Sequence, residues 1–297
     1  MIAVDTAGSV DFWRWVPHPE VWVLIGGLVA LYVYAARVIG PKVVAPGEPA
    51  VTAAQKRWFA FGIILLWVAA DWPVHDIGEQ YLYFVHMVQH ILLTLVIAPV
   101  MLLATPEWLA RLVVGRGRAD SLVHKLARPI PAGIAFNALA LLSHWPTLVN
   151  TASANGLFHY GVHTAFMVTA ILFWIPVCGP FPELRISPPA QMVYLFVASI
   201  VPTVPGAWLT FAEGAVYSAY DIPDRLWGLT VTSDQQIAGL LMKLGAGSYL
   251  WLLITIIFFR WASDHESMHG ASPSTTLTYD EVEREFREHP APPAEVS

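Results

Sequence analysis

The chain has 297 residues, of which 56% are hydrophobic and only 13% are charged. Soluble domains usually carry about 25% charged residues, so this composition excludes an ordinary soluble protein and is typical of an integral membrane protein. The formal net charge of −6 comes with no basic run that would indicate nucleic-acid binding, and the single cysteine excludes an internal disulfide or a paired-thiol metal motif.

Seven apolar segments follow one another along the chain. The predicted spans are residues 21–38, 58–70, 82–104, 130–148, 158–177, 190–209 and 236–259. A helix needs about 20 apolar residues to cross the hydrocarbon core. Because lipid cannot hydrogen-bond an exposed backbone, such segments should be helical. The sequence therefore predicts an all-α, polytopic membrane protein with seven transmembrane helices.

Basic residues occur in alternate connections between these spans. The first connection holds Arg37, Lys42, Lys56 and Arg57, and the third holds Arg111, Arg116, Arg118, Lys125 and Arg128. The second and fourth connections contain no Lys or Arg, although Arg14 and Arg225 fall on the same side as these two. Basic loops stay cytoplasmic, so we expect the N-terminus outside and the C-terminus in the cytoplasm.

The chain divides into two predicted regions. Residues 1–261 form the seven-helix transmembrane domain. Residues 262–297 are polar, with Pro, Glu, Ser and Thr, which is typical of a flexible segment. We predict a flexible cytoplasmic tail there, with a short helix from Tyr279 to Glu288.

Histidines gather at the outer side of the predicted bundle. His86 and His90 lie in the outer half of the third span, His144 lies near the outer end of the fourth, and His159 and His163 open the fifth. The inner halves of the spans contain no His, Asp or Glu. Ionisable residues inside a membrane are costly and mark functional sites, so the pattern indicates a pocket open to the outside and sealed below.

The spacing of the histidines favours a shared metal ion. His86 and His90 are four residues apart and share one helix face, as do His159 and His163. Met167 extends the second row by one turn. Two such faces on neighbouring helices supply three or four imidazoles; imidazole with thioether favours copper, whereas imidazole alone also suits zinc or iron.

Other polar groups near the outer ends are candidates for a surrounding shell or an entry path. They are Asp71, His75, His144, Asp234, Gln235, Met242 and Lys243. Lys243, about two turns into the seventh span, should pair with Asp71 or Glu213. Each candidate also has a plainer interpretation, because buried histidines hydrogen-bond between helices and methionines such as Met167 and Met242 fill cores.

Four short motifs resemble those of the bacterial caa3-type cytochrome c oxidase assembly factors (the CtaG family). They are HMVQHILLT at 86–94, LFHYGVH at 157–163 followed by LFWIP at 172–176, DQQIAG at 234–239, and SHWP at 143–146. The resemblance extends from about Trp58 to Trp261 and so covers most of the chain.

This resemblance implies a seven-helix membrane protein that matures a haem-copper oxidase, and delivery of copper to that oxidase is the usual proposal for the family. We therefore expect a multi-pass protein of the bacterial plasma membrane, without enzymatic activity, that binds copper as Cu(I). His86, His90, His159 and His163 match as copper ligands, and Asp234 and Gln235 match as motif residues. The implied partners are the oxidase subunits and an extracytoplasmic copper donor.

Two other functions fit the residues, and a third is disfavoured. A haem-binding or haem-handling membrane protein would use His90 and His163 as axial ligands. A metal-free assembly scaffold would use the same histidines only as hydrogen bonds between helices. A metal permease is disfavoured, because the inner halves of the spans are apolar.

Overall fold

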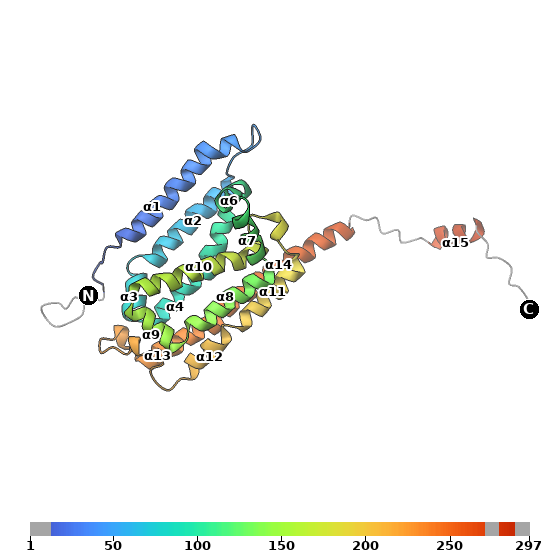
Figure 1. Cartoon of the computed structure of the whole chain (residues 1–297). Helices are drawn as coiled ribbons and strands as arrows, with labels where there is room; N and C mark the ends of the chain where they lie inside the picture. Colours follow the sequence, from blue (N-terminus) through green and yellow to red (C-terminus); the bar gives the residue numbers. More distant parts are fainter. Residues whose placement is uncertain (1–12, 271–278, 289–297) are drawn as a thin grey trace, which may run out of the picture.

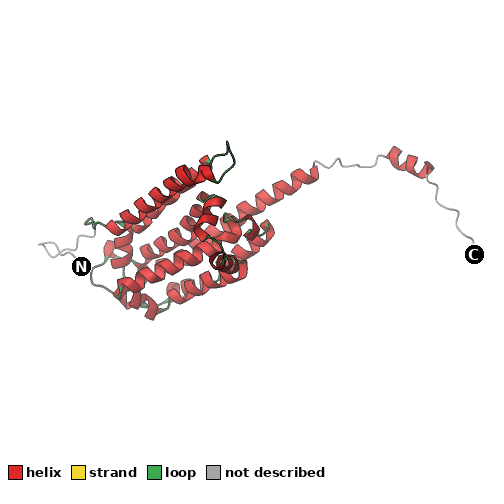
Figure 2. Ribbon diagram, turned by 45° about the horizontal axis from the view of Figure 1, so that its top comes forward, coloured by secondary structure: helices red, strands yellow, loops and turns green. Residues whose placement is uncertain are grey.

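The computed structural model describes residues 13–270 and 279–288. Helices make up 80% of the structure, and the described residues contain no strand. Figure 2 shows these helices as one bundle from which the last long helix extends. The predicted all-α class is therefore confirmed.

Six helical stretches are long and apolar enough to cross a membrane, and a bent pair would make a seventh. The six are Pro19–Lys42, Ala53–Gln80, Tyr83–Ala104, Gly156–Cys178, Pro188–Phe211 and Val231–Glu266. The bent pair joins α7 (Arg118–Leu126) to α8 (Pro129–Ser143) at an angle of 75°. Each predicted span thus has a helical counterpart, the fourth being α8.

Most of these stretches consist of two or more helices. The remaining α-helices are α1 (Pro19–Tyr34), α2 (Ala53–Ala70), α3 (Val74–Gln80), α4 (Tyr83–Ile91), α5 (Ala98–Ala104), α6 (Glu107–Val114), α9 (Pro146–Ala154), α10 (Gly156–Cys178), α11 (Pro188–Ile200), α12 (Thr203–Phe211), α13 (Val231–Leu240), α14 (Ala246–Gly270) and α15 (Tyr279–Glu288). Wider π-helical turns occur at Ala35–Ile39, Leu92–Ile97 and Leu241–Gly245. Short 3-10 turns occur at Gly40–Lys42, Pro182–Leu184, Ser218–Tyr220 and Leu226–Gly228.

Local sequence explains where several helices start and bend. Thr52 and Gln55 form a reciprocal capping box at the start of α2. The Asn155 side chain accepts from the Phe158 backbone N–H at the start of α10. Pro99 lacks a backbone N–H and so cannot continue the hydrogen-bond ladder of the preceding turn, and the wide turn Leu92–Ile97 lies there.

Several predicted boundaries differ from the structure. Helix α2 begins at Ala53 because its capping box precedes the apolar run. The fourth span ends at Ser143 rather than at 148, because Pro146 opens a separate helix, α9. Helix α14 continues to Gly270, into the predicted tail. The short helix predicted at Tyr279–Glu288 is present, whereas 271–278 and 289–297 lie outside the described residues.

The two ends of the bundle are built differently. Figure 1 shows α3, α9 and α13 gathered at one end, where α1 begins, and α6 and α7 at the other end, where α14 leaves the bundle. We call these the α3 end and the α6 end. The basic residues of the third connection belong to the α6 end, because Arg111 lies on α6 and Lys125 on α7.

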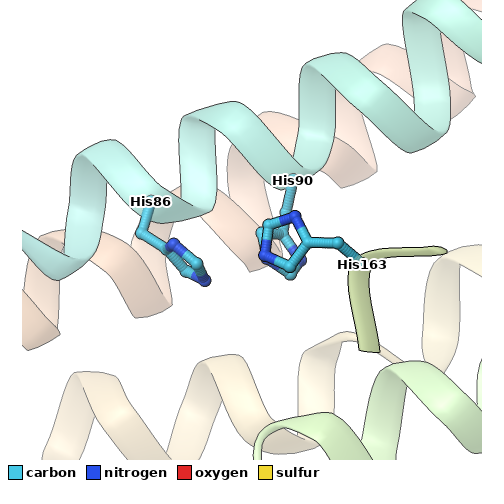
Figure 3. Close-up of side chains that lie close together, drawn as sticks. All are labelled: His86, His90 and His163. Carbon is cyan, nitrogen blue, oxygen red and sulfur yellow. The ribbon is translucent and has the colours of Figure 1, made fainter. Parts of the chain in front are cut away.

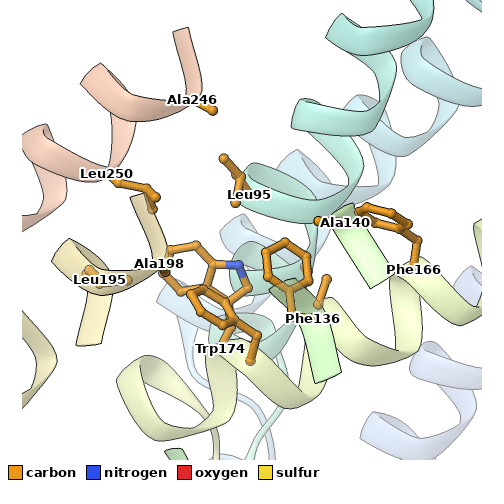
Figure 4. Close-up of a cluster of buried hydrophobic side chains, with 12 residues drawn as sticks. Leu95, Phe136, Ala140, Phe166, Trp174, Leu195, Ala198, Ala246 and Leu250 are labelled. Atoms are coloured by element: carbon orange, nitrogen blue, oxygen red, sulfur yellow. The ribbon is translucent and has the colours of Figure 1, made fainter. Parts of the chain in front are cut away.

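The largest apolar core lies in the middle of the bundle. It unites buried side chains from α8, α10, α11 and α14 with Leu95 of the wide turn after α4 (Figure 4). Trp174 lies at its centre, and its indole N–H donates to the Thr94 carbonyl at 2.8 Å. The contact ties α10 to the segment that follows α4, which fixes the two helices that carry the histidine pairs.

Candidate metal centre

The two histidine pairs face each other across the space between α4 and α10. The Nε2 atoms of His90 and His163 are 3.2 Å apart. Ring centroids are 4.4 Å apart for His86 and His90 and 4.3 Å apart for His159 and His163. Figure 3 shows His86 and His90 projecting from α4 toward the ring of His163. The structure thus brings all four predicted imidazoles into one cluster.

Two sets of three ligand atoms in this cluster lie close enough to share an ion. His86, His90 and His163 form the first set, with all three atoms within 4.8 Å of one another. Glu79, His159 and His163 form the second set within the same limit. His163 belongs to both sets and joins them into one centre.

Glu79 on α3 is part of the centre, although it is not among the residues predicted from the sequence. Its Oε1 atom lies 2.9 Å from His159 Nε2 and 3.1 Å from His86 Nδ1. These distances are short, yet none of the three buried atoms forms a hydrogen bond of acceptable geometry with a described residue. The carboxylate forms ion pairs with both imidazoles, and ligand atoms directed at a common cation would have the same arrangement.

Close contact between α3 and α4 places Glu79 in the centre. A Cβ atom on Gly78 would lie 3.0 Å from the His86 backbone nitrogen and 3.1 Å from its Cα. Only glycine leaves room for this approach. One signal in the sequence indicates this contact. The second connection carries several acidic residues but no Lys or Arg to neutralise them, so nearby histidines are the expected partners of these carboxylates.

A cavity of about 230 Å³ adjoins the histidines. Its lining includes all four imidazoles together with His144, Met87 and Tyr220, and apolar side chains of α8 and α9. A second cavity of about 60 Å³ is lined almost entirely by apolar side chains, with Met87, His90, His144 and Met242 among its walls. The centre is therefore polar where the pairs meet and apolar beyond His90.

Asp234 and Gln235 hold the backbone around the centre and lie outside the cluster. Both side chains are buried. The Asp234 carboxylate accepts from the backbone N–H groups of Tyr83 and Phe84 at 3.0 and 2.9 Å, and so caps the first turn of α4. Gln235 Oε1 accepts from the Val216 backbone N–H at 2.8 Å. Their roles in the fold are structural.

A tyrosine in the loop before α13 supports the end of α8. Burial raises the pKa of Tyr217 to about 12, so its hydroxyl stays protonated. That hydroxyl donates to the His144 carbonyl at 2.8 Å. Tyr220 donates in the same way to the Gly78 carbonyl at 3.0 Å, which ties this loop to α3.

Asp71 at the end of α2 and His75 on α3 flank the centre. Asp71 accepts from the indole N–H groups of Trp22 and Trp67 and from the Trp72 backbone. His75 Nδ1 lies 3.2 Å from the Gln89 side-chain amide. Neither residue belongs to the two sets of ligand atoms.

The predicted ion pair of Lys243 is wrong. Lys243 is exposed on the wide turn Leu241–Gly245 and forms no ion pair with any described residue. Asp71 is occupied by three N–H donors, and Glu213 is exposed in the loop after α12. An ammonium at the surface of the bundle needs no ion pair, because a long flexible stem lets such a group extend toward water.

The methionines occupy different positions around the centre. Met167 is partly buried against the central apolar core and lines a very small cavity with His90 and His163. Met242 is buried and lines the 60 Å³ cavity. Met87 is buried on α4, between His86 and His90 in sequence, and its sulfur faces His144.

One comparison with known proteins gives a match. A family model described as cytochrome c oxidase caa3 assembly factor matches residues 30–264, which is well over half of the chain and includes both histidine pairs. No curated protein and no solved structure is similar enough to the chain to give a match.

Proposed function

The chain belongs to the family of cytochrome c oxidase caa3 assembly factors, and we propose that it serves oxidase assembly by holding a copper ion between α4 and α10. Copper is then a cargo that the protein receives and passes on. The role is one of binding and transfer, and the proposed site uses side chains of helices that the central core holds in place.

The distance between His90 Nε2 and His163 Nε2 carries this proposal. At metal–nitrogen distances of about 2.0 Å, two imidazoles in a trigonal or tetrahedral site have nitrogen atoms about 3.3–3.5 Å apart. The two atoms here, from helices far apart in sequence, are separated by 3.2 Å. His86 supplies a third ligand atom within 4.8 Å of both.

The donor set supports copper. Imidazole suits copper, zinc and iron, whereas thioethers near the same site favour Cu(I). Met87 and Met167 line the small cavities around His90. We therefore propose Cu(I) as the bound form, with Glu79 and His159 forming the side of the centre that an incoming ion meets first.

The position of the centre suggests the direction of transfer. The centre lies at the α3 end, opposite the basic residues of α6 and α7. Basic loops face the cytoplasm in membrane proteins. We propose a protein of the bacterial plasma membrane that receives copper from an extracytoplasmic donor and presents it to haem-copper oxidase subunits on that side.

Haem binding fits this geometry less well than copper binding. Axial histidines approach haem iron from opposite faces of the macrocycle, which must lie between their rings. The ring centroids of His90 and His163 are only 4.6 Å apart. A porphyrin would require α4 and α10 to separate, and these helices are held together through Trp174 and Thr94.

Metal analysis of the purified protein tests the proposal. We expect the wild-type chain to bind copper after loading and dialysis, and the single variants His90→Asn and His163→Asn to lose that copper at the histidine centre. His124→Asn is the matched control, because this imidazole lies on α7 at the α6 end.

Thermal unfolding of each variant should accompany the copper measurement, so that loss of the metal is separated from loss of the fold. Equal copper content in the wild type and both histidine variants would overturn the copper site. A wild-type chain that binds no copper, but still supports oxidase assembly in cells, would favour a metal-free scaffold.

A further inference from the structure

The His144 ring is held between two groups that both offer electron pairs. Its Nδ1 atom lies 2.5 Å from the Ala140 carbonyl oxygen, and its Nε2 atom lies 3.3 Å from the Met87 sulfur. His144 and Met87 are both buried, with 7% and 3% of their surface exposed. His144 lies at the C-terminal end of α8, where the Tyr217 hydroxyl donates to the His144 backbone carbonyl.

One proton cannot satisfy both contacts. A neutral imidazole has one N–H group, and a carbonyl oxygen can only accept. The network therefore assigns the proton to Nδ1, since Ser143, the other neighbour of Nδ1, has its hydroxyl directed to the same carbonyl at 3.1 Å. The Nε2 lone pair then faces the lone pairs of the thioether sulfur.

Adding a second proton to the His144 ring would satisfy both contacts, but it costs free energy at this position. An imidazolium would be buried among apolar side chains, and desolvation penalises the charged form. A cation that accepts both lone pairs would satisfy the contact without charging the ring. Nitrogen and thioether together are ligands for a soft ion.

Met242 adds a further thioether to the same place. The 60 Å³ cavity is lined by Met87, Met242, His90 and His144 in an otherwise apolar wall. Met242 is itself buried. A monovalent ion is the least costly charge to place in such surroundings, because the desolvation cost increases with charge.

We propose that Met87 and His144, with Met242 in the wall of the same cavity, form a second binding site for a soft monovalent cation, namely Cu(I). The role of this site in copper transfer rests on the proposed function, whereas its existence does not. His90, Met87 and His144 line both this cavity and the 230 Å³ cavity beside the histidine centre. An ion that leaves the histidine centre past His90 therefore meets thioether ligands next.

X-ray absorption of the full-length protein loaded with Cu(I) under reducing conditions tests the site. We expect sulfur as well as nitrogen scatterers around copper in the wild type. Met87→Leu should reduce the sulfur signal and weaken Cu(I) binding at this second site at least about tenfold, by analogy with the loss of a supporting ligand group. Met242→Leu should reduce the sulfur signal. Leucine for methionine nearly conserves volume, so the fold should persist.

Met101→Leu is the matched control, because this thioether lies against Gly62 between α2 and α5. A variant in which His86, His159 and His163 are all changed to Asn separates the two proposals: it should lose the histidine centre and keep Cu(I) with sulfur ligation. Only nitrogen scatterers in the wild type, no Cu(I) binding, or a sulfur signal unchanged in both Met87→Leu and Met242→Leu would overturn the second site.

Discussion

Glu79 lies between histidines of two different helices. Its carboxylate is close to His86 on α4 and to His159 on α10. A negative charge at this point draws a cation toward the centre and favours the ring orientation in which His86 directs its other nitrogen to His90 and His163. Carboxylates that support metal-binding histidines in this way affect affinity strongly.

The Glu79→Gln variant should bind copper about 10–100-fold more weakly than the wild type. The amide keeps the shape of the side chain and removes its charge. Competition with a chromogenic copper chelator measures the affinity, and Glu183→Gln at the α6 end is the control, since Glu183 pairs with Arg111 and His124. An unchanged affinity in Glu79→Gln would place the carboxylate outside the copper site.

The sequence predicted the histidines of the centre far better than their neighbours. A spacing of four residues places two imidazoles on one face of any helix, so His86 with His90 and His159 with His163 could be paired without coordinates. Glu79 reaches the centre through the packing of α3 against α4, and Met87 of α4 meets the His144 ring at the end of α8. Such contacts depend on helix positions that no periodicity in one segment encodes.

At the scale of elements, α4 is held in position by contacts with residues that lie far from it in the sequence. Its first turn is capped by the Asp234 carboxylate of α13, and Arg225 Nη2 lies 3.4 Å from the same carboxylate. Helix α12 packs closely against α13. A Cβ atom on Gly239 would lie only 2.5 Å from the Gly206 carbonyl oxygen, so glycine is needed there. The DQQIAG motif of α13 thus connects this helix to α4 and α12 beside the centre.

The Asp234→Ala variant should lower the stability of the bundle and its copper affinity together. Two buried N–H groups of α4 would lose their acceptor, at a cost of about 1–3 kcal/mol for each unsatisfied group. Thermal unfolding in detergent and chelator competition measure the two effects. Thr52→Ala, which removes the exposed cap of α2, should cost about 1 kcal/mol and leave copper affinity unchanged. A wild-type melting temperature in Asp234→Ala would contradict this role.

The positions of the spans were largely predictable, whereas their internal breaks were not. The hydropathy pattern predicts one continuous apolar span from 82 to 104, yet Pro99 and the wide turn before it divide that span into α4 and α5. The fourth span ended early because Pro146 begins α9. Breaks of this kind depend on single residues, and window-based hydropathy averages over them.

At the scale of the whole molecule, the bundle is chemically polarised. The α3 end carries the histidine centre and the buried carboxylates of Asp71, Asp76 and Asp234. The α6 end carries an exposed network in which Arg111 and His124 both bind Glu183. A bundle with one acidic, histidine-rich end and one basic end has a preferred orientation across a membrane, because basic residues resist translocation.

Single cysteines placed at the two ends test this orientation in intact cells. In a Cys178→Ser background, Ser218→Cys lies in the exposed turn before α13 at the α3 end, and Ser121→Cys is exposed on α7 at the α6 end. A membrane-impermeant maleimide should label Ser218→Cys at once and Ser121→Cys only after the plasma membrane is permeabilised. The reverse pattern would turn the histidine centre toward the cytoplasm. Copper would then have to come from the cytoplasm, and an extracytoplasmic donor would have no access to His86, His90 or His163.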